Sequence, residues 1–339
     1  MSLALEPRAM IAAALFLGGL SAPGLGAGES RGFLLVANKG GQTLSIVDAA
    51  REIQVAAVPE DGNTGHEVAV SPDGLRAFVP IYGNSGVGKA GSDGRLIRVI
   101  DLKRRAIVGT VDFGRGIRPH RPVFGPRNGL LYVTTELSDS VTIIDPRTLA
   151  ILGTIPTGHD ESHMLAISSD GRRGYTANVK SGTVSVLDLE RKSLVTSIAV
   201  APVVQRIALS TDDRWAFTAD QTALRLAVID TSANTVRRSI PLPGLAFGTA
   251  PTPDGRWLLV AMPAVSLVGV VDLASMRVVR TIGVPKAPQE VLVRPDGLVA
   301  YVSCDSSAQV AVIDLGRWSV RRLIDVGPVD DGLAWAPSE

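Results

Sequence analysis

A motif that recurs about every 42 residues constrains the fold of this chain more than any other feature. It is a turn, seen most clearly in Ser71-Pro72-Asp73-Gly74. The first residues of its seven copies are separated by 54, 43, 42, 42, 42 and 42 positions. A short β-rich run ending in Asp alternates with the turn, at Asp48, Asp101, Asp145, Asp188, Asp230, Asp272 and Asp314. Self-similarity at this period predicts a repeat architecture, here of seven units with four strands each.

The stretch from Gly174 to Leu189 is the clearest copy of the strands that follow a turn, and it sets the alignment of the other repeats. In the turns with the sequence Pro-Asp-Gly, Pro supplies a preset φ, Asp a local hydrogen bond and Gly a permitted positive φ, which together make a tight turn. Tyr175–Asn178 and Thr183–Leu187 show the alternation and the Val, Ile and Thr enrichment that are typical of strands. No helix is predicted within the repeats.

The two ends of the repeat region complement each other. Three strands are predicted at its start, within residues 33–58, and a lone first strand at its end, from Gly332 to Ala336. We therefore predict an all-β, seven-bladed propeller over residues 32–339, in which the C-terminal strand completes the N-terminal blade. Such closure removes the exposed sheet edge.

The first 28 residues have a different composition. Arg8 precedes the apolar run Met10–Leu20, and small residues follow up to Gly28. This pattern predicts a signal peptide and a periplasmic or secreted protein. The apolar run is too short for a stable transmembrane helix, so no integral membrane segment is expected in the mature chain.

Composition limits the classes of partner and cofactor. The 34 basic and 33 acidic side chains are well mixed, which argues against a nucleic-acid partner. A c-type haem requires Cys-x-x-Cys-His, and the chain has a single cysteine, Cys304.

Three strand segments carry a family resemblance. Tyr132-Val133-Thr134-Thr135, Tyr175-Thr176-Ala177-Asn178 and Tyr301-Val302-Ser303-Cys304 resemble the signature of YVTN-repeat propellers, which include YncE-like periplasmic proteins and surface-layer proteins. The resemblance covers residues 32–339 and implies the propeller fold. Related propellers include sugar lactonases, lyases and binding modules, so the resemblance does not choose a function.

Two adjacent columns of the repeat hold most of the candidate site. The position five residues before each turn is occupied by His66, His120, His163, Gln205, Phe247, Gln289 and Asp331. The next position is occupied by Glu67, Arg121, Met164, Arg206, Gly248, Glu290 and Gly332. Because these positions start the innermost strands, we expect them to ring the mouth of the central channel. Three of the four histidines of the chain fall in the first column.

The histidine column supports more than one chemistry. His66, His120 and His163 could bind a divalent metal, Zn, Cu or Fe, although the sequence identifies no cofactor. Alternatively, His120 or His163 could transfer protons, with Glu67 or Glu290 as general base, in a lactonase-like hydrolase or a lyase. Whether the chain is an enzyme stays open at this stage.

The third possibility is binding without catalysis, for which the candidates are Arg121, Arg206, Gln205, Gln289, Asp331 and Phe247. The leading prediction is a propeller that binds a small polar ligand or a metal ion in its central funnel. A catalytic funnel is the first alternative, and a scaffold that binds a partner protein is the second. In the least specific interpretation, the cluster only satisfies strand ends and channel water.

Charge along the same columns predicts a polarised funnel. Carboxylates come from the sixth, seventh and first repeats and arginines from the second to fourth, so we expect an anionic ligand group to face the arginines. Phe247 and Gly248 predict an apolar, open segment in the fifth repeat.

An insertion from Tyr82 to Gly94 is predicted to cover the funnel in part. Gly83 through Lys89 imitates a phosphate-binding loop, but Ala90 and the lack of a following helix argue against a nucleotide site.

Overall fold

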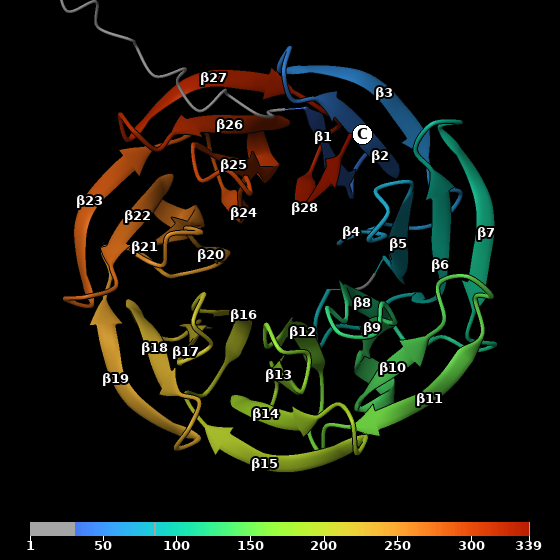
Figure 1. Ribbon diagram of the computed structural model, residues 1–339, viewed down its shortest axis with the longest axis horizontal. Helices are drawn as coiled ribbons and strands as arrows, with labels where there is room; N and C mark the ends of the chain where they lie inside the picture. Colours follow the sequence, from blue (N-terminus) through green and yellow to red (C-terminus); the bar gives the residue numbers. More distant parts are fainter. Residues whose placement is uncertain (1–30, 85, 339) are drawn as a thin grey trace, which may run out of the picture.

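Seven antiparallel four-stranded sheets surround a central channel in a closed ring (Figure 1). The computed structural model describes residues 31–84 and 86–338. It confirms the predicted seven-bladed β-propeller. The predicted signal peptide, residues 1–28, lies outside the described residues. Within the part that is described, no helix has the length and apolarity to cross a membrane.

The blades are numbered here by their turns, so the first turn, at Ser71, belongs to blade 1. In blades 1 to 6 the strands run in chain order from the channel to the rim. The strands of blades 1 to 4 are β4 (Ala69–Val70), β5 (Arg76–Gly83), β6 (Asp93–Asp101) and β7 (Ala106–Asp112); β8 (Pro119–Phe124), β9 (Leu131–Thr135), β10 (Ser140–Ile144) and β11 (Ile151–Pro156); β12 (Ser162–Ile167), β13 (Arg173–Asn178), β14 (Thr183–Asp188) and β15 (Ser193–Ala199); β16 (Val204–Leu209), β17 (Trp215–Asp220), β18 (Arg225–Asp230) and β19 (Thr235–Pro241).

Blades 5 and 6 follow the same plan, whereas blade 7 combines both ends of the repeat region. Their strands are β20 (Thr249–Pro251), β21 (Trp257–Met262), β22 (Leu267–Asp272) and β23 (Arg277–Gly283); β24 (Pro288–Val293), β25 (Val299–Cys304), β26 (Gln309–Asp314) and β27 (Ser319–Asp325); β28 (Asp330–Pro337), β1 (Gly32–Asn38), β2 (Thr43–Asp48) and β3 (Ile53–Pro59).

Three single turns of 3-10 helix depart from the expectation of no helix. They are η1 (Glu136–Ser138), η2 (Pro263–Val265) and η3 (Asp305–Ser307). Each joins the second and third strands of its blade, on the face where the insertion of blade 1 also lies.

Each repeated turn is held by its own side chains. In blade 3 the Ser168 hydroxyl donates to Asp170 Oδ1 at 2.6 Å, and Asp170 Oδ1 accepts from the Arg172 backbone N–H at 2.9 Å. The second repeated Asp acts in the same way between the third and fourth strands, where Asp188 Oδ1 accepts from the Glu190 and Arg191 amides. Both aspartates therefore recur because each shapes a turn.

Ring closure occurs in blade 7 as predicted. β28 pairs antiparallel with β1, with Leu34 opposite Trp335, Leu35 opposite Ala334 and Val36 opposite Leu333. Figure 1 shows β28 as the innermost strand of this blade. The apolar residues of neighbouring sheets interdigitate, and one buried cluster joins Phe78 of blade 1 to Val133 of blade 2. Each blade is thus buried against both neighbours.

We predict that deletion of residues 331–339 abolishes the cooperative thermal unfolding of the protein. The deletion removes most of β28 and exposes the edge of β1, so the expected loss is comparable with the whole stability of a domain, about 5–15 kcal/mol. Circular dichroism during heating tests this. Deletion of residues 338–339, which leaves β28 intact, is the control. A melting curve for the larger deletion that matches the control would contradict the prediction.

Candidate functional site

The predicted columns meet at one end of the channel because the inner strands carry bulges there. Pairing between β8 and β9 shifts register between Pro119 and Pro122, and the pairing of β16 with β17 shifts between Val204 and Ile207. A bulge places two consecutive side chains on one face of a strand. His120 and Arg121 therefore both reach the channel, although simple alternation would send them to opposite faces.

Three histidine rings pack together at the first column. The ring centroids of His120 and His163 lie 3.7 Å apart with a stacked geometry, and those of His66 and His120 lie 5.4 Å apart, edge to face. His120 and His163 are 1% and 2% exposed, whereas His66 is half-buried. The fourth histidine, His159, is not part of these ring contacts. We call His66, His120 and His163 the histidine cluster.

Glu136 and Tyr82 hold His163 in place. Glu136 Oε1 contacts Nδ1 of His163, and Glu136 Oε2 accepts a hydrogen bond of 2.6 Å from the Tyr82 hydroxyl. Glu136 is buried, and burial followed by the Glu136 charge raises the pKa of Tyr82, so this hydroxyl stays protonated. Nε2 of His163 faces Gln205, whose Nε2 lies 3.4 Å away.

The other two histidines are neutral at ordinary pH. Burial, followed by the nearby His163 and His66 side chains, lowers the pKa of His120 well below its usual value. Burial lowers the pKa of His66 to about 3, although Asp331 opposes this effect. Nδ1 of His120 is buried and has no hydrogen-bond partner among the described residues. An unpartnered buried nitrogen is costly, so it marks a position where a ligand atom would be stabilising.

The stacked geometry of the histidine cluster bears on the predicted metal site. Among the described residues, no group of three or more His, Cys, Asp or Glu side chains is placed to hold a metal ion. The lone pair of an imidazole nitrogen lies in the plane of its ring, so two stacked rings direct their lone pairs side by side instead of toward one point. The rings of His120 and His163 differ by 28° and would have to rotate to share an ion. Metal binding by these residues therefore stays an untested prediction.

Residues of the second column, together with Asp331 of the first, form a buried ionic network across the channel, centred on Arg206. Nη1 of Arg206 contacts Glu67 Oε1 and Glu290 Oε2, both at 2.6 Å, and Nη2 contacts Asp331 Oδ1 at 2.9 Å. These carboxylates come from blades 1, 6 and 7. Arg206 is 3% exposed, so all these charges are paired inside the protein.

Arg121 and Lys39 extend this network on either side. Nη1 of Arg121 contacts Glu67 Oε2 and lies 3.4 Å from Glu290 Oε1. Nζ of Lys39 lies 3.0 Å from Asp331 Oδ2 and 3.5 Å from Asp305 Oδ2. Arg121, Arg206, Lys39, Glu67, Glu290 and Asp331 are called the channel ion network below.

The carboxyls of this network have opposite pKa shifts. Burial raises the pKa of Glu290 to about 7, against the opposing charges of Arg206 and Arg121. Burial alone would also raise the pKa of Asp331, but Lys39 and Arg206 outweigh it and lower the pKa overall. The raised pKa brings proton exchange at Glu290 toward neutral pH.

The predicted separation of charge across the funnel is wrong. Arg121 and Arg206 do not form a free basic side, because both reach across the channel to Glu67 and Glu290. Sequence position alone does not reveal this, since an arginine side chain is long enough to cross a narrow channel.

The predicted open segment at Gly248 is also wrong. A Cβ atom on Gly248 would lie 2.2 Å from the Gln289 carbonyl oxygen, and the Gly248 amide donates to that oxygen at 2.9 Å. Gly332 is similarly close to Glu67 and His66. The absence of side chains therefore brings neighbouring inner strands into contact and narrows the channel.

The remaining predicted binding residues lie around the network. Phe247 covers the Arg206 guanidinium, with 4.6 Å between the ring centroid and Cζ. Gln205, Gln289 and Phe247 are half-buried. Gln205 contacts His163, whereas Gln289 makes only a 3.5 Å contact with the Ala287 carbonyl oxygen. The structure thus brings all the predicted site residues to one end of the channel, and their roles stay predictions.

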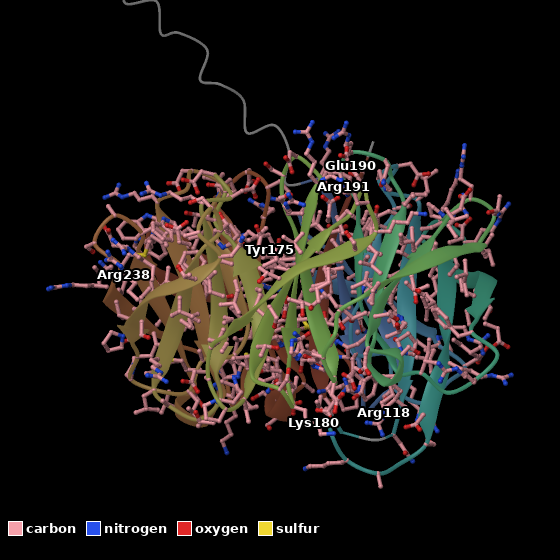
Figure 2. All side chains as sticks on the ribbon, turned by 90° about the horizontal axis from the view of Figure 1, so that it is seen from below. Arg118, Tyr175, Lys180, Glu190, Arg191 and Arg238 are labelled. Atoms are coloured by element: carbon pink, nitrogen blue, oxygen red, sulfur yellow. The ribbon has the colours of Figure 1, made fainter. Side chains whose placement is uncertain are left out.

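The insertion of blade 1 is shorter than predicted, since β5 extends through Gly83 and β6 begins at Asp93. Tyr82 is consequently a buried strand residue and not part of a loop. Arg118 fastens the loop, because it donates to Lys89 O at 2.7 Å and to Asp93 Oδ1 at 2.7 Å. Its guanidinium also lies 5.8 Å from the centroid of the Tyr82 ring. Figure 2 shows Arg118 at one face of the propeller, with Glu190 and Arg191 at the opposite face.

Sequence reasoning missed Tyr82, Glu136, Lys39 and Glu60. Tyr82 lies at the end of the second strand of blade 1 and Glu136 directly follows that of blade 2. Both stand eleven residues after the first residue of their turns, and this shared repeat position is the signal that could have found them. Glu60 precedes His66 and holds the segment that carries it, because its Oε2 accepts from the Gly65 amide at 3.0 Å. Burial raises the pKa of Glu60 to about 7.

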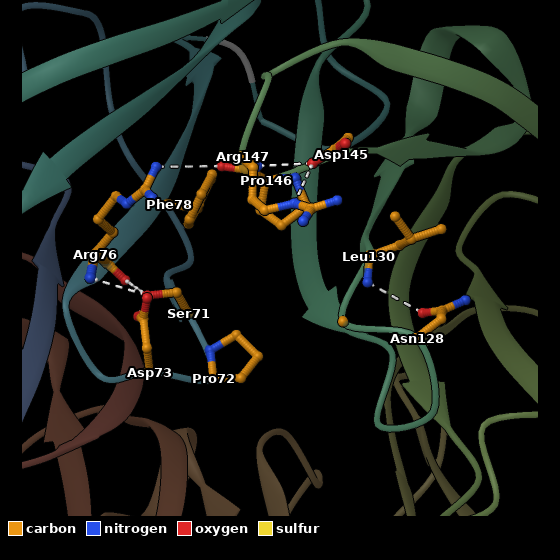
Figure 3. A pocket seen from close by; sticks show the side chains of 11 residues that line it. Ser71, Pro72, Asp73, Arg76, Phe78, Asn128, Leu130, Asp145, Pro146 and Arg147 are labelled. Carbon is orange, nitrogen blue, oxygen red and sulfur yellow. Dashed lines mark hydrogen bonds and ion pairs between the residues drawn. The ribbon is translucent and has the colours of Figure 1, made fainter.

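A groove of about 400 Å³ lies on the other face, between blades 1 and 2 (Figure 3). Its polar groups are engaged with one another. Arg76 donates to the Pro146 carbonyl oxygen at 3.3 Å, and Asp145 accepts from the Arg147 amide at 2.8 Å. The groove lies at the opposite end of the inner strands from the histidine cluster.

Comparison with known proteins supports the fold and not a family. No protein-family model matches the chain, and no curated protein sequence matches it. Hydrazine synthase of Kuenenia stuttgartiensis is a structural neighbour, with 18% identity, a TM-score of 0.74, and coverage of 84% of this chain and 92% of that chain. A functionally unknown protein of Desulfotomaculum acetoxidans DSM 771 has 14% identity and a TM-score of 0.75, with coverage of 91% and 100%.

A third neighbour is the dihydro-haem d1 dehydrogenase NirN in complex with DHE. It has 18% identity and a TM-score of 0.63, and the match covers 88% of this chain and 66% of that chain. All three identities are low, so these neighbours establish the propeller fold alone.

We predict that Arg206→Met destabilises the protein by about 3–5 kcal/mol, because the substitution leaves three buried carboxylates without their central partner. Urea denaturation measures the difference. Arg127→Met is the matched control, since the Arg127–Glu190 pair is about half exposed and is worth about 0–1 kcal/mol. Equal losses in the two variants would show that the channel network has no special energetic role.

We also predict a pH-dependent difference between wild type and Glu60→Gln. The pKa of Glu60 rises from 4.5 to about 7 on folding. The native state therefore binds more protons than the unfolded state in this range, and the contribution of Glu60 falls as pH rises through 7. The variant should lose less stability between pH 5 and pH 8, by up to about 3 kcal/mol. Urea titrations at several pH values test this, with Glu190→Gln as the exposed control, and parallel profiles would contradict it.

Proposed function

We propose that this protein binds a small polar ligand at the histidine end of its central channel. The observation that carries the proposal is the unpartnered Nδ1 of the buried His120, whose ring packs against the rings of His66, Tyr82 and His163. Two half-buried polar side chains belong to this region: His66 is one of these rings, and Gln205 contacts His163. A concave site with a few convergent polar groups is the usual form of a small-molecule site.

The channel ion network supports this role as a rigid base. Its charges come from five blades and are mutually paired, so the inner strands are held at fixed positions around the cluster. Fixed partners reduce the free energy needed to order a site when a ligand binds.

Acid–base catalysis is the second candidate, and the Glu136–His163 contact favours it. A carboxylate on Nδ1 orients an imidazole and stabilises the charge that forms when Nε2 accepts a proton. His163 would then take a proton from a bound ligand through Nε2, beside Gln205. This chemistry suits the hydrolase or lyase alternative, with His163 as the base. His120 is held neutral, and Glu67 and Glu290 are engaged by arginines.

The proposal also includes the location of the protein and the propeller family to which it belongs. The sequence pattern of residues 1–28 supports export to the periplasm or outside the cell, and the Tyr-Val-Thr segments support a YVTN-repeat, YncE-like propeller. The third candidate, a scaffold for a partner protein, has no specific contact in its favour.

A thermal-shift screen of small polar compounds tests the proposed function. Compounds that bind the cluster should raise the melting temperature of wild type and of His159→Asn, in which the histidine lies outside the cluster. They should not raise that of His66→Asn/His120→Asn. A ligand at 100 times its dissociation constant stabilises by about 2.7 kcal/mol. If every stabilising compound acts equally on all three proteins, the proposed site is wrong.

Each such compound is then incubated with wild type and with Glu136→Gln, and its products are analysed. Turnover by wild type that is lost in Glu136→Gln at a saturating concentration of the compound would establish the catalytic candidate. Binding without turnover in wild type would leave the ligand-binding function alone.

A further inference from the structure

The charges around the histidine cluster do not favour the anionic ligand that the sequence suggests. Three cationic side chains, Lys39, Arg121 and Arg206, contact four carboxylates, and a fifth carboxylate contacts His163. The carboxylates are Glu67, Glu290, Asp331, Asp305 and Glu136. Each of the three cations is already in contact with at least two of them.

Glu136 is the carboxylate with the least compensation. It is 1% exposed, and its contacts are the Tyr82 hydroxyl and the His163 ring, neither of which carries a permanent charge. The cationic side chain that comes next in this series of contacts is Arg118, and it is already paired with Asp93. Buried charge without a full partner is costly, so an additional positive charge near Glu136 would be stabilising.

Each neutral histidine ring offers one acceptor nitrogen and one N–H donor. In the tautomer of His163 that donates from Nδ1 to Glu136, Nε2 carries the lone pair, and Gln205 Nε2 lies 3.4 Å from it. His66 and His120 stay neutral because burial lowers the pKa of each, so each ring keeps one acceptor nitrogen. His120 cannot donate from both nitrogens, and its Nδ1 has no protein partner.

We infer that the ligand of the histidine cluster carries a compact ammonium or amine group, which donates hydrogen bonds to the imidazole nitrogens and offsets the charge of Glu136. The inference rests on the proposed function and specifies the class of its ligand. An ammonium group has several donors on one small centre, and it therefore suits acceptors that come from different blades. A carboxylate or phosphate group would meet lone pairs and an uncompensated carboxylate.

The stacked rings separate this ligand class from a metal ion. Hydrogen bonds tolerate a wide range of acceptor directions, whereas a metal ion requires each lone pair to point at it. Rings 3.7 Å apart can each accept a hydrogen bond without rotation.

The chain contains its own reporters for a test by NMR. It has four histidines, of which three form the cluster and His159 lies outside it. The ring signals, assigned with single His→Asn variants, are followed during separate titrations with methylammonium chloride, sodium acetate and zinc chloride at constant ionic strength. We expect methylammonium to shift the signals of His66, His120 and His163 to saturation, with His159 unchanged.

A variant of Glu136 tests the source of the selectivity. Glu136→Gln should weaken methylammonium binding roughly tenfold, as expected for loss of a charged partner, while Glu190→Gln on the other face should leave it unchanged. If Glu136→Gln does not fold, the wild-type protein is titrated with methylammonium and acetate in competition. The ring signals then show whether the cluster prefers the cationic or the anionic ligand.

The outcomes separate this inference from the proposed function. Saturable binding of acetate but not methylammonium at the cluster would overturn the ammonium class and leave the ligand site standing. Saturable binding of zinc without methylammonium would also overturn it and establish the metal alternative. If none of the three probes shifts the ring signals of the cluster at a lower concentration than the one that shifts the His159 signal, both the ligand class and the proposed site are wrong.

Discussion

The guanidinium of Arg206 is the interaction on which the rest of the channel depends. It contacts carboxylates from three other blades at 2.6 to 2.9 Å, inside a channel that water scarcely reaches. Pairing of this kind adds little net stability, because removing the charges from water costs about as much as their attraction returns. Its consequence is geometric. The inner strands cannot shift relative to one another without leaving a buried charge unpaired, so the position of each channel residue is determined by the others.

The histidine cluster uses the frame that this network provides. Bulges in β8, β16 and β24 let Arg121, Arg206 and Glu290 join the network, while His120 joins the cluster and Gln205 contacts it at His163. Glu136 and Tyr82 reach the cluster from the ends of second strands and select one orientation of His163. At Gly248 and Gly332 the fifth and seventh blades also make close contacts with neighbouring inner strands. A nearly regular ring thereby acquires an irregular centre, which is where a specific site can form.

The distribution of charge also explains how this propeller differs from a simple basic or acidic funnel. Every arginine of the second column is neutralised by residues that are distant in sequence, whereas Glu136 has only uncharged or weakly basic neighbours. The electrostatic character of the site is therefore decided by one carboxylate outside both columns. The insertion loop adds a further connection, because Arg118 binds its backbone and packs on Tyr82.

The amino-acid sequence by itself determined the number of blades, the strand order and the ring closure. These follow from short-range turn chemistry at Ser168–Asp170 and Asp188 and from strand alternation, which repeat at a fixed period. It also identified the columns that face the channel. Only the tertiary structure decided which charges meet, because Arg206 and Glu67 are 139 positions apart and their contact depends on the width of the channel. Tyr82 and Glu136 share a repeat position, eleven residues after the first residue of each turn. They were missed because only the packing of neighbouring blades brings both of them to His163.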